Sequence, residues 1–169
     1  MKTLLLLRHA KSSWEDTTLD DHKRPLNERG KKDAPVMGEY LKNKNLTPDF
    51  IISSTAKRAK ETSKLVAKYC RYNKDIQSSK SLYGTSIKDY LNTIGGIANE
   101  YDRVLITGHN PILEETLETI TGEQISMKTC SLAHISLLIK SWKEVNDNIT
   151  TKGKLIDIVH IKKLHKDSS

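Results

Sequence analysis

The chain has few of the residues that mark secreted, zinc-binding and base-stacking proteins. Its 169 residues include only two cysteines, Cys70 and Cys130, and a single phenylalanine. Two distant thiols do not make a disulfide framework, and neither has the spacing of a zinc site. One Phe, with no interleaving of aromatic and basic residues, offers no platform on which bases would stack. We therefore predict a reducing compartment, no metal or other cofactor, and no nucleic-acid partner.

Long hydrophobic runs are also missing. No apolar stretch approaches the ~20 residues that a membrane-spanning helix needs. The first run, Leu4 to Leu7, is too short for the core of a signal peptide. We expect a cytoplasmic protein without membrane contact. With 36% hydrophobic and 29% charged residues, the composition is typical of a globular chain, and the length suits one domain over residues 1–169.

Positive charge is plentiful, because the formal net charge is +7. Such an excess favours anionic ligands, which include nucleic acids and phosphorylated substrates. The lysines are spread along the chain, and on helices most of them should face solvent. The charge therefore favours an anionic substrate over a nucleic-acid groove.

Apolar patterning predicts the fold. Short continuous runs predict three buried strands, and alternating runs predict two more that should pair as an antiparallel hairpin. The strands are expected at residues 3–8, 49–53, 103–108, 133–140 and 155–161. Helical spacing predicts helices at residues 27–43, 55–72, 86–99 and 111–120. Strands that alternate with helices indicate an α/β fold, a three-layer sandwich with a mostly parallel central sheet and helices on both faces.

The remaining segments have weaker patterns. Residues 10–26 are polar and rich in Asp, which predicts a long loop, and residues 76–83 fit either an edge strand or an extended loop. Pro35 should kink the helix at 27–43 or delay its start. Residues 142–153 are polar and turn-like. The tail, Lys162 to Lys166, is expected to be a frayed, solvated end.

Polar side chains follow three of the predicted strands. Arg8-His9 ends the first strand, Ser54 to Arg58 follows the second, and His109-Asn110 follows the third. In open α/β sheets, ligands bind beyond the carboxyl ends of the strands. Helix N-termini point unpaired backbone N–H groups into the same space. The sequence therefore predicts one anion-binding pocket that contains two arginines and two histidines.

These residue types suit phosphoryl transfer. A neutral imidazole can attack phosphorus, provided that its attacking nitrogen is unprotonated. We expect a backbone carbonyl to hold the other ring nitrogen. Arginine donates in a planar, bidentate geometry that matches phosphate oxygens. Because phosphoryl transfer depends mostly on positioning and charge stabilisation, such a pocket can work without Mg²⁺.

The motifs resemble those of the histidine phosphatase superfamily. They are Leu-Arg-His-Ala at 7–10, Arg-Pro-Leu at 24–26, Ser-Thr-Ala-Lys-Arg-Ala-Lys-Glu-Thr at 54–62 and Gly-His-Asn-Pro at 108–111. Their order matches the family, and the Arg-Pro-Leu element and the compact size are similar to its small phosphohistidine phosphatase branch. The resemblance extends from residue 1 to about residue 115, and the C-terminal third contributes only compatible strands.

The resemblance implies roles for four residues. His9 would be the nucleophile that becomes phosphorylated. Arg8 and Arg58 would clamp the phosphoryl oxygens, and His109 would add a further donor to the transferring group. Water would then hydrolyse the phosphoenzyme.

Three further residues are candidates for substrate binding. Arg24, in the Arg-Pro-Leu element, is one of them, although a loop salt bridge to Asp20 or Asp21 is an equal alternative. Ser54 and Asn110 are the others, because both stand at strand ends beside the predicted pocket.

Two departures from the wider family bear on the substrate. The mutase branch has Gly after the Arg-His pair and Asn after a nearby Trp, where this chain has Ala10 and Glu15. Mutases and many phosphomonoesterases also use a Glu as general acid, but the matching segment, residues 80–86, has no carboxylate. An alkoxide leaving group needs a positioned acid, whereas an imidazole with a pKa of roughly 6.5 takes its proton from solvent.

The sequence therefore favours a phosphatase that acts on phosphohistidine in proteins. A small-molecule phosphomonoesterase is the alternative, with Asp16, Asp20 or Asp21 of the long loop as its acid. A third interpretation is a phosphate-dependent or nucleic-acid-binding module that has lost catalysis.

Overall fold

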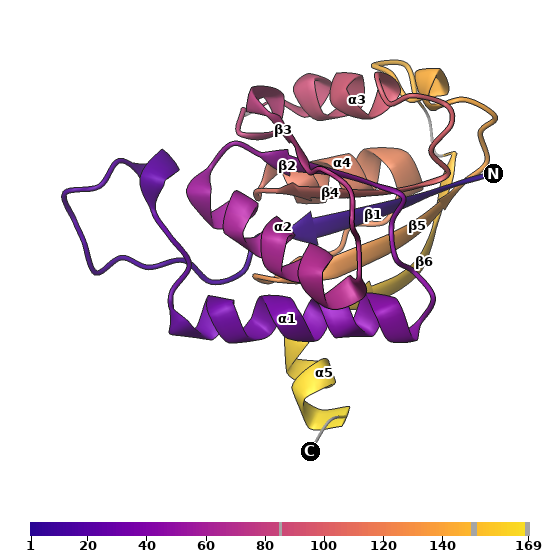
Figure 1. Cartoon of the computed structure of the whole chain (residues 1–169). Helices are drawn as coiled ribbons and strands as arrows, with labels where there is room; N and C mark the ends of the chain where they lie inside the picture. The colour runs from indigo at the N-terminus through magenta and orange to yellow at the C-terminus, as the bar shows by residue number, and fades with distance from the viewer. Residues whose placement is uncertain (85, 150–151, 168–169) are drawn as a thin grey trace.

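The computed structural model describes residues 1–84, 86–149 and 152–167. Within these residues, six strands form one sheet in the order β3-β2-β4-β1-β5-β6, with helices on both faces (Figure 1). The strands are β1 (Lys2–Arg8), β2 (Phe50–Ser54), β3 (Gln77–Ser79), β4 (Arg103–Gly108), β5 (Leu132–Leu137) and β6 (Gly153–Val159). Strands β1 to β4 pair in parallel, while β5 is antiparallel to both β1 and β6. The predicted three-layer α/β sandwich and the C-terminal hairpin are confirmed.

The sheet is covered on both faces, which explains the continuous apolar run of β1. Leu4 and Leu6 belong to one hydrophobic core, and Leu5 and Leu7 belong to the core on the other face. All four leucines are completely buried. A strand that packs against helices on both sides buries consecutive residues, so its sequence does not alternate.

Five helices make the outer layers of the described chain. They are α1 (Glu28–Asn43), α2 (Lys57–Cys70), α3 (Ile87–Gly95), α4 (Ile112–Thr121) and α5 (Ile161–Asp167). The first core packs against α3 and α4, and the second against α1, α2 and α5. Gly122 ends α4 in the left-handed conformation, with φ of 78°. The helix predicted at 86–99 is shorter than expected and ends at its Gly95-Gly96 pair.

Helix α1 begins where the sequence predicts. The side chain of Asn27 accepts a hydrogen bond of 2.8 Å from the backbone N–H of Gly30, and the helix starts at Glu28. Pro35 lies inside the helix and does not delay its start, so that part of the prediction is wrong. Proline removes one backbone donor, and the buried face that includes Met37 and Leu41 holds the helix together around it.

The expectation of a frayed tail is wrong. Residues 161–167 form α5, and this helix packs against α1. Ile161 is buried, and Leu164 packs against the core on that side of the sheet. The ring nitrogen Nε2 of His165 lies 2.7 Å from the Asp33 carboxylate of α1. The burial of Ile161 and the packing of Leu164 help to order a short helix that shows little sequence pattern.

The turn-like segment after β5 contributes a residue to the hydrophobic core. Trp142 is completely buried, and its indole N–H donates a 2.7 Å hydrogen bond to the carbonyl of Tyr101. A short 3-10 helix, Trp142–Glu144, carries this side chain into the core beside α3. The polar neighbours of the tryptophan conceal its role as a core residue.

Two segments with weak sequence patterns contain short elements of secondary structure. Residues 76–83 contain the short edge strand β3 and a 3-10 helix, Lys80–Leu82. The long loop at 10–26 carries a 3-10 helix at Asp21–Lys23 and a single bridge between Ser12 and Leu26.

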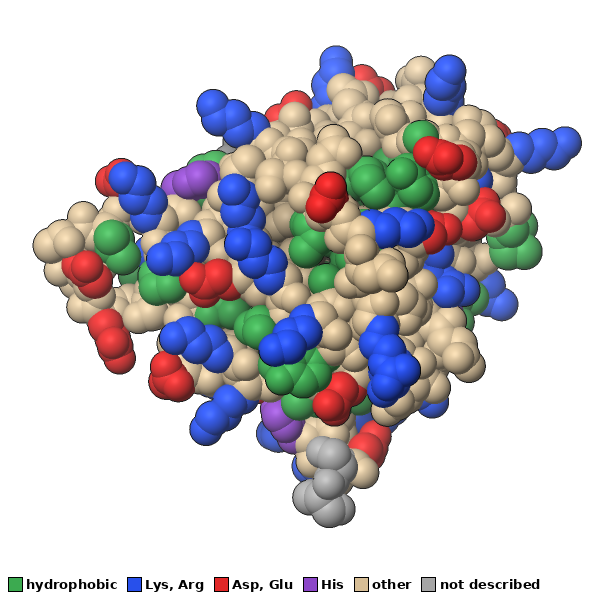
Figure 2. Space-filling model, viewed as in Figure 1, with side chains coloured by type: hydrophobic (Ala, Val, Ile, Leu, Met, Phe, Trp, Pro, Cys, Tyr) green, Lys and Arg blue, Asp and Glu red, His purple; other side chains and the backbone are tan. Residues whose placement is uncertain are grey.

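Two observations concern the surface. Lys and Arg side chains are spread over the face shown in Figure 2, with acidic side chains between them. In the part of the chain that the structure describes, no helix has both the length and the apolarity to cross a membrane.

Candidate active site

The carboxyl ends of three parallel strands meet at one edge of the sheet. In the register of the sheet, Arg8 of β1 lies opposite Gly108 of β4. The backbone N–H of His9 donates a 3.2 Å hydrogen bond to the Gly108 carbonyl. The two residues that follow the strands, His9 and His109, therefore lie together, with ring centroids 5.1 Å apart. The structure brings together the two imidazoles that the sequence singled out.

His9 is held as a neutral imidazole. Only 8% of it is exposed, and its Nδ1 lies 2.7 Å from the Ala10 carbonyl. Because a carbonyl only accepts hydrogen bonds, the proton is on Nδ1 and the lone pair is on Nε2. Burial lowers the pKa of His9 to about 4; the Ala10 carbonyl opposes this shift, and the charges of Arg58, Arg8 and Arg24 add to it. The ring has the protonation state that a nucleophile requires.

The backbone after His9 is fixed by α2. The N–H of Ala10 donates a 3.0 Å hydrogen bond to the hydroxyl of Thr62, which itself donates to the Arg58 carbonyl at 2.7 Å. The same turn of α2 therefore positions both the loop that follows β1 and the arginine that lies near His9.

His109 is anchored by two hydroxyl groups. Its Nε2 lies 2.8 Å from the Ser54 hydroxyl, and its backbone N–H donates a 3.0 Å hydrogen bond to the Tyr90 hydroxyl. The Tyr90 hydroxyl donates in turn to the carbonyl of Leu82. At Gly108 a Cβ atom would collide with this hydroxyl, so the site requires glycine.

The ring of His109 is also neutral. Burial lowers its pKa to about 3, and the nearby His9 and Arg58 act in the same direction. Its Nδ1 is buried and has no hydrogen-bond partner among the described residues. The structure therefore places Ser54 as a support for His109, and not as a freely exposed hydroxyl.

Two buried arginines near His9 share one carboxylate. Arg58, of which 7% is exposed, donates from Nη1 to the backbone carbonyl of Asp21 at 2.7 Å and from Nη2 to its carboxylate at 3.0 Å. Arg24, of which 6% is exposed, donates to the other carboxylate oxygen at 3.0 Å. The guanidinium of Arg24 also stacks on Trp14, 3.1 Å from the ring centroid. The structure shows the loop salt bridge, which Arg24 makes to Asp21; substrate binding by Arg24 stays a prediction.

Asp21 is the loop aspartate that reaches the pocket. Its carboxylate also accepts a 2.8 Å hydrogen bond from the hydroxyl of Tyr83. Burial acts to raise the pKa of Asp21, but hydrogen bonds from Tyr83, Arg58 and Arg24 outweigh it and lower the pKa to about 2. Asp21 is therefore an anion that lies between two guanidinium groups. Asp16, which lies on the same loop, instead accepts a hydrogen bond from the backbone N–H of Thr18.

Arg8 and Asn110 meet at a single carbonyl. Arg8 Nη1 and Asn110 Nδ2 donate to the Met127 carbonyl at 2.9 and 2.8 Å. The same Asn110 amide donates to Glu114 at 2.8 Å, and Glu114 accepts the backbone N–H of Met127 at 2.7 Å. The Asn110 amide thus braces the loop that carries Met127. The Nε of Arg8 is buried without a partner among the described residues.

Two neighbours of the site were not anticipated. Tyr83 lies with its ring edge-on to His109 at 5.6 Å, and His22 lies edge-on to Tyr83 at 4.7 Å. The Nε2 of His22 is 2.9 Å from the Thr55 hydroxyl. Neither residue follows a strand or belongs to a periodic segment, so no sequence pattern marks them. In the ranges that the structure describes, no group of three or more His, Cys, Asp or Glu residues is arranged to hold a metal ion.

Comparison with known proteins gives consistent matches. The profile of the histidine phosphatase superfamily (branch 1) matches residues 4–90. An uncharacterised chloroplastic protein of Arabidopsis thaliana is 31% identical over 152 residues, which cover 85% of this chain and 70% of the plant protein. The crystal structure of a candidate phosphohistidine phosphatase SixA from Agrobacterium tumefaciens is 28% identical, with a TM-score of 0.79, and the match covers 94% of this chain and 97% of that one. The protein histidine phosphatase SixA in complex with tungstate has a TM-score of 0.82 at 18% identity, with 96% and 99% of the two chains covered.

Proposed function

Because the chain belongs to the histidine phosphatase superfamily and is a phosphatase, we propose that it acts through a phosphohistidine formed on His9. We further propose that its substrate is phosphohistidine carried by a protein. The observation that carries the first proposal is the state of His9, a buried neutral ring with its proton on Nδ1. Its Nε2 has the free electron pair that must attack phosphorus.

The reaction proceeds in two displacements. In the first, a bond forms between His9 Nε2 and phosphorus while the bond from phosphorus to the leaving group breaks. Arg8, Arg24 and Arg58 donate hydrogen bonds to the phosphoryl oxygens, and the neutral His109 donates one more. In the second displacement, water attacks the phosphorus, and inorganic phosphate and free His9 result. Positioning and positive charge supply the stabilisation of the transition state.

The resting state of the pocket supports a phosphoramidate substrate. Asp21, the carboxylate that pairs with Arg24 and Arg58, has a pKa of about 2 and carries no proton to give. The leaving imidazole of a phosphohistidine accepts a proton from solvent. An alkoxide is a poorer leaving group and needs a proton from a positioned acid. The SixA relative of Agrobacterium tumefaciens, matched over 94% of this chain, bears the name of a phosphohistidine phosphatase and agrees with this choice.

One observation favours a second function, a small-molecule phosphomonoesterase. Half of the Asp21 side chain is exposed, so it has room to turn toward solvent when a phosphoryl group takes its place at the arginines. Away from Arg24 and Arg58, its pKa would rise toward that of an ordinary carboxyl. Asp21 would then be able to protonate an alkoxide.

A substrate panel separates the two functions. We expect kcat/KM for a phosphohistidine peptide to exceed that for phosphoserine and sugar phosphates by about a hundredfold, because only the imidazole leaves without a positioned acid. Phosphate release is the measurement. The Asp21→Asn variant is the control, and it should retain turnover of the phosphohistidine peptide. Faster turnover of sugar phosphates, lost in Asp21→Asn, would instead establish the phosphomonoesterase.

Asp21 should also compete with phosphate for the arginines. In Asp21→Asn the two guanidiniums lose their internal anion, and we expect inorganic phosphate to bind about fivefold more tightly. Isothermal titration calorimetry measures this affinity directly. Asp20→Asn changes the neighbouring carboxylate and should leave the affinity unchanged. Weaker binding in Asp21→Asn would show that the carboxylate holds the arginines in place and does not compete.

A further inference from the structure

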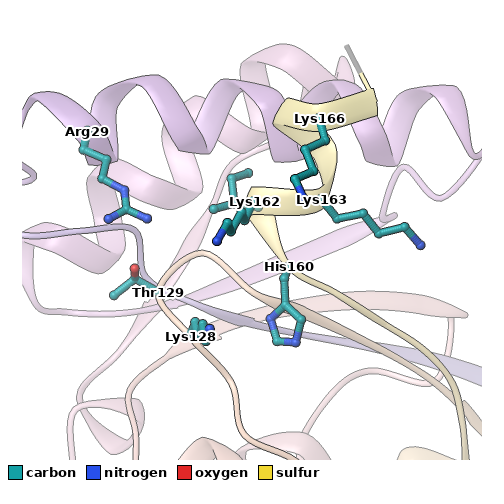
Figure 3. A pocket seen from close by; sticks show the side chains of 8 residues that line it. Arg29, Lys128, Thr129, His160, Lys162, Lys163 and Lys166 are labelled. Carbon is teal, nitrogen blue, oxygen red and sulfur yellow. The ribbon is translucent and has the colours of Figure 1, made fainter. Parts of the chain in front are cut away.

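A cavity lies apart from His9, His109 and Arg58, none of which is among its described lining residues. It has a volume of about 610 Å³ and lies between the start of α1, residues 128–129 and α5 (Figure 3). Its cationic lining residues are Arg29, Lys128, Lys162, Lys163 and Lys166, and no Asp or Glu is among the described residues that line it. Arg29 of α1 and Lys162 of α5 project toward Lys128 and Thr129 (Figure 3).

The fold brings these cations together from three separate elements. Ile161 is buried and fixes α5 on the sheet, so that the lysines that follow it are exposed. The acid nearest to Arg29 is Asp33, whose carboxylate lies 3.5 Å from the guanidinium and is itself almost completely buried. His160 also lines the cavity and is bonded to the Ser131 hydroxyl at 2.8 Å. Clustered cations repel one another, and a bound anion relieves that repulsion.

The cavity shares a wall with the site of His9. Lys128 and Thr129 directly follow Met127, whose carbonyl accepts the hydrogen bond of Arg8. The backbone N–H of Cys130 lies 3.1 Å from the carbonyls of both Arg8 and His9. One short segment, residues 127–130, therefore supports the end of β1 and also forms part of the cationic cavity.

We propose that this cavity binds an acidic surface of the phosphorylated protein whose phosphohistidine is presented to His9. The inference rests on the proposed function and names the chemistry of the partner. A protein is a large substrate that extends beyond the phosphoryl pocket, and opposite charge on its surface would speed the encounter and orient it. An acidic protein fits better than a single-stranded nucleic acid, because no Phe, Tyr or Trp among the described lining residues offers a surface for stacking bases.

Charge reversal at the cavity tests the proposal. The probes are three phosphohistidine peptides with the same centre and acidic, neutral or basic flanks, together with p-nitrophenyl phosphate. In Lys128→Glu/Lys162→Glu, we expect kcat/KM for the acidic peptide to fall about tenfold or more and the preference for acidic flanks to disappear. Turnover of p-nitrophenyl phosphate should stay within about twofold, because the phosphoryl pocket is unchanged.

Two controls accompany this variant. Lys64→Glu/Lys143→Glu makes the same change in net charge on α2 and on the segment after β5, away from the cavity, and should have little effect on the acidic peptide. Lys128→Gln/Lys162→Gln removes the charges without adding acids, and should give a smaller loss in the same direction. Circular dichroism establishes that each variant is folded.

A binding measurement distinguishes a failure of the cavity proposal from a failure of the proposed function. A fluorescent, unphosphorylated Glu-rich peptide should bind the wild type and His9→Ala alike, and should bind Lys128→Glu/Lys162→Glu much more weakly. If no phosphohistidine peptide is hydrolysed but this binding is seen, the proposed function is wrong and the anionic site stands. If the peptides are hydrolysed equally whatever their flanks and the Glu-rich peptide does not bind, the cavity proposal is wrong. Tighter binding of a DNA oligonucleotide through the same two lysines would overturn the acidic-protein assignment.

Discussion

The His9→Ala variant should lose at least about a thousandfold in kcat on any phosphorylated substrate, because the substitution removes the atom that bonds to phosphorus. No other side chain of the described pocket replaces it. The ring of His109 is neutral too, but in the proposed mechanism it donates an N–H to the phosphoryl group. Its ring contacts the Ser54 hydroxyl and not a backbone carbonyl that would fix a lone pair toward phosphorus, as Ala10 does for His9. Steady-state phosphate release, with substrate binding followed separately, measures the loss.

Two control variants test whether the loss comes from removal of the nucleophile itself. In His109→Ala we expect a smaller loss, of about a hundredfold, since that variant lacks one hydrogen-bond donor and keeps the nucleophile. His9→Gln retains a polar side chain of similar reach and should be as inactive as His9→Ala. If either His9 variant keeps turnover near the wild-type rate while remaining folded, the assignment of the nucleophile is wrong.

The Arg58→Ala variant should have the second largest effect, a fall of about a hundredfold to a thousandfold in kcat/KM. Arg58 is almost completely buried, and its two terminal nitrogens both point to Asp21, at 2.7 and 3.0 Å. When phosphate displaces the carboxylate, the same fork can engage two phosphoryl oxygens. Arg58→Lys should recover only a small part of the loss, because an ammonium group cannot make the bidentate contact.

A matched arginine provides the control for Arg58. Arg103 begins β4 and donates to the carbonyls of Asn45 and Thr47, at the opposite end of the sheet from His9. Arg103→Ala should lower the stability of the fold and leave kcat/KM near the wild-type value. An Arg58→Ala enzyme with wild-type kcat/KM would contradict the proposed role of Arg58.

The sequence was a good guide wherever a residue follows a buried strand. The apolar runs of β1 and β4 end at Arg8 and Gly108, and their parallel pairing puts the next residues side by side. The meeting of His9 and His109 therefore follows from strand boundaries and register alone. The N-cap at Asn27 and the stop at Gly122 are equally local, because each depends on the chemistry of one residue.

Other features depend on contacts that no local pattern encodes. Asp20 and Asp21 are neighbours with the same side chain, and only the folded loop determines that Asp21 meets Arg24 and Arg58. Tyr83 joins them from the segment after β3. The helix at 161–167 was missed for the same reason, because its order comes from packing on α1. Tertiary contacts decide the details of the pocket, while strand order decides where the pocket is.

The state of Asp21 links the structure to the choice of substrate. Its carboxylate pairs with both arginines and so compensates two buried positive charges. In the proposed reaction, a phosphoryl group replaces this carboxylate at the arginines. We expect this exchange to make the site selective for ligands that carry more negative charge than one carboxylate, which phosphoryl groups do at neutral pH.

The most direct test of the account is to trap the covalent intermediate and locate it. Enzyme mixed with a phosphohistidine peptide labelled with radioactive phosphorus is quenched within the first turnover, digested and mapped. We predict acid-labile, base-stable label on the peptide that contains His9, present in His109→Ala and absent from His9→Ala. Label on another residue, or steady turnover without any label on the protein, would contradict the account.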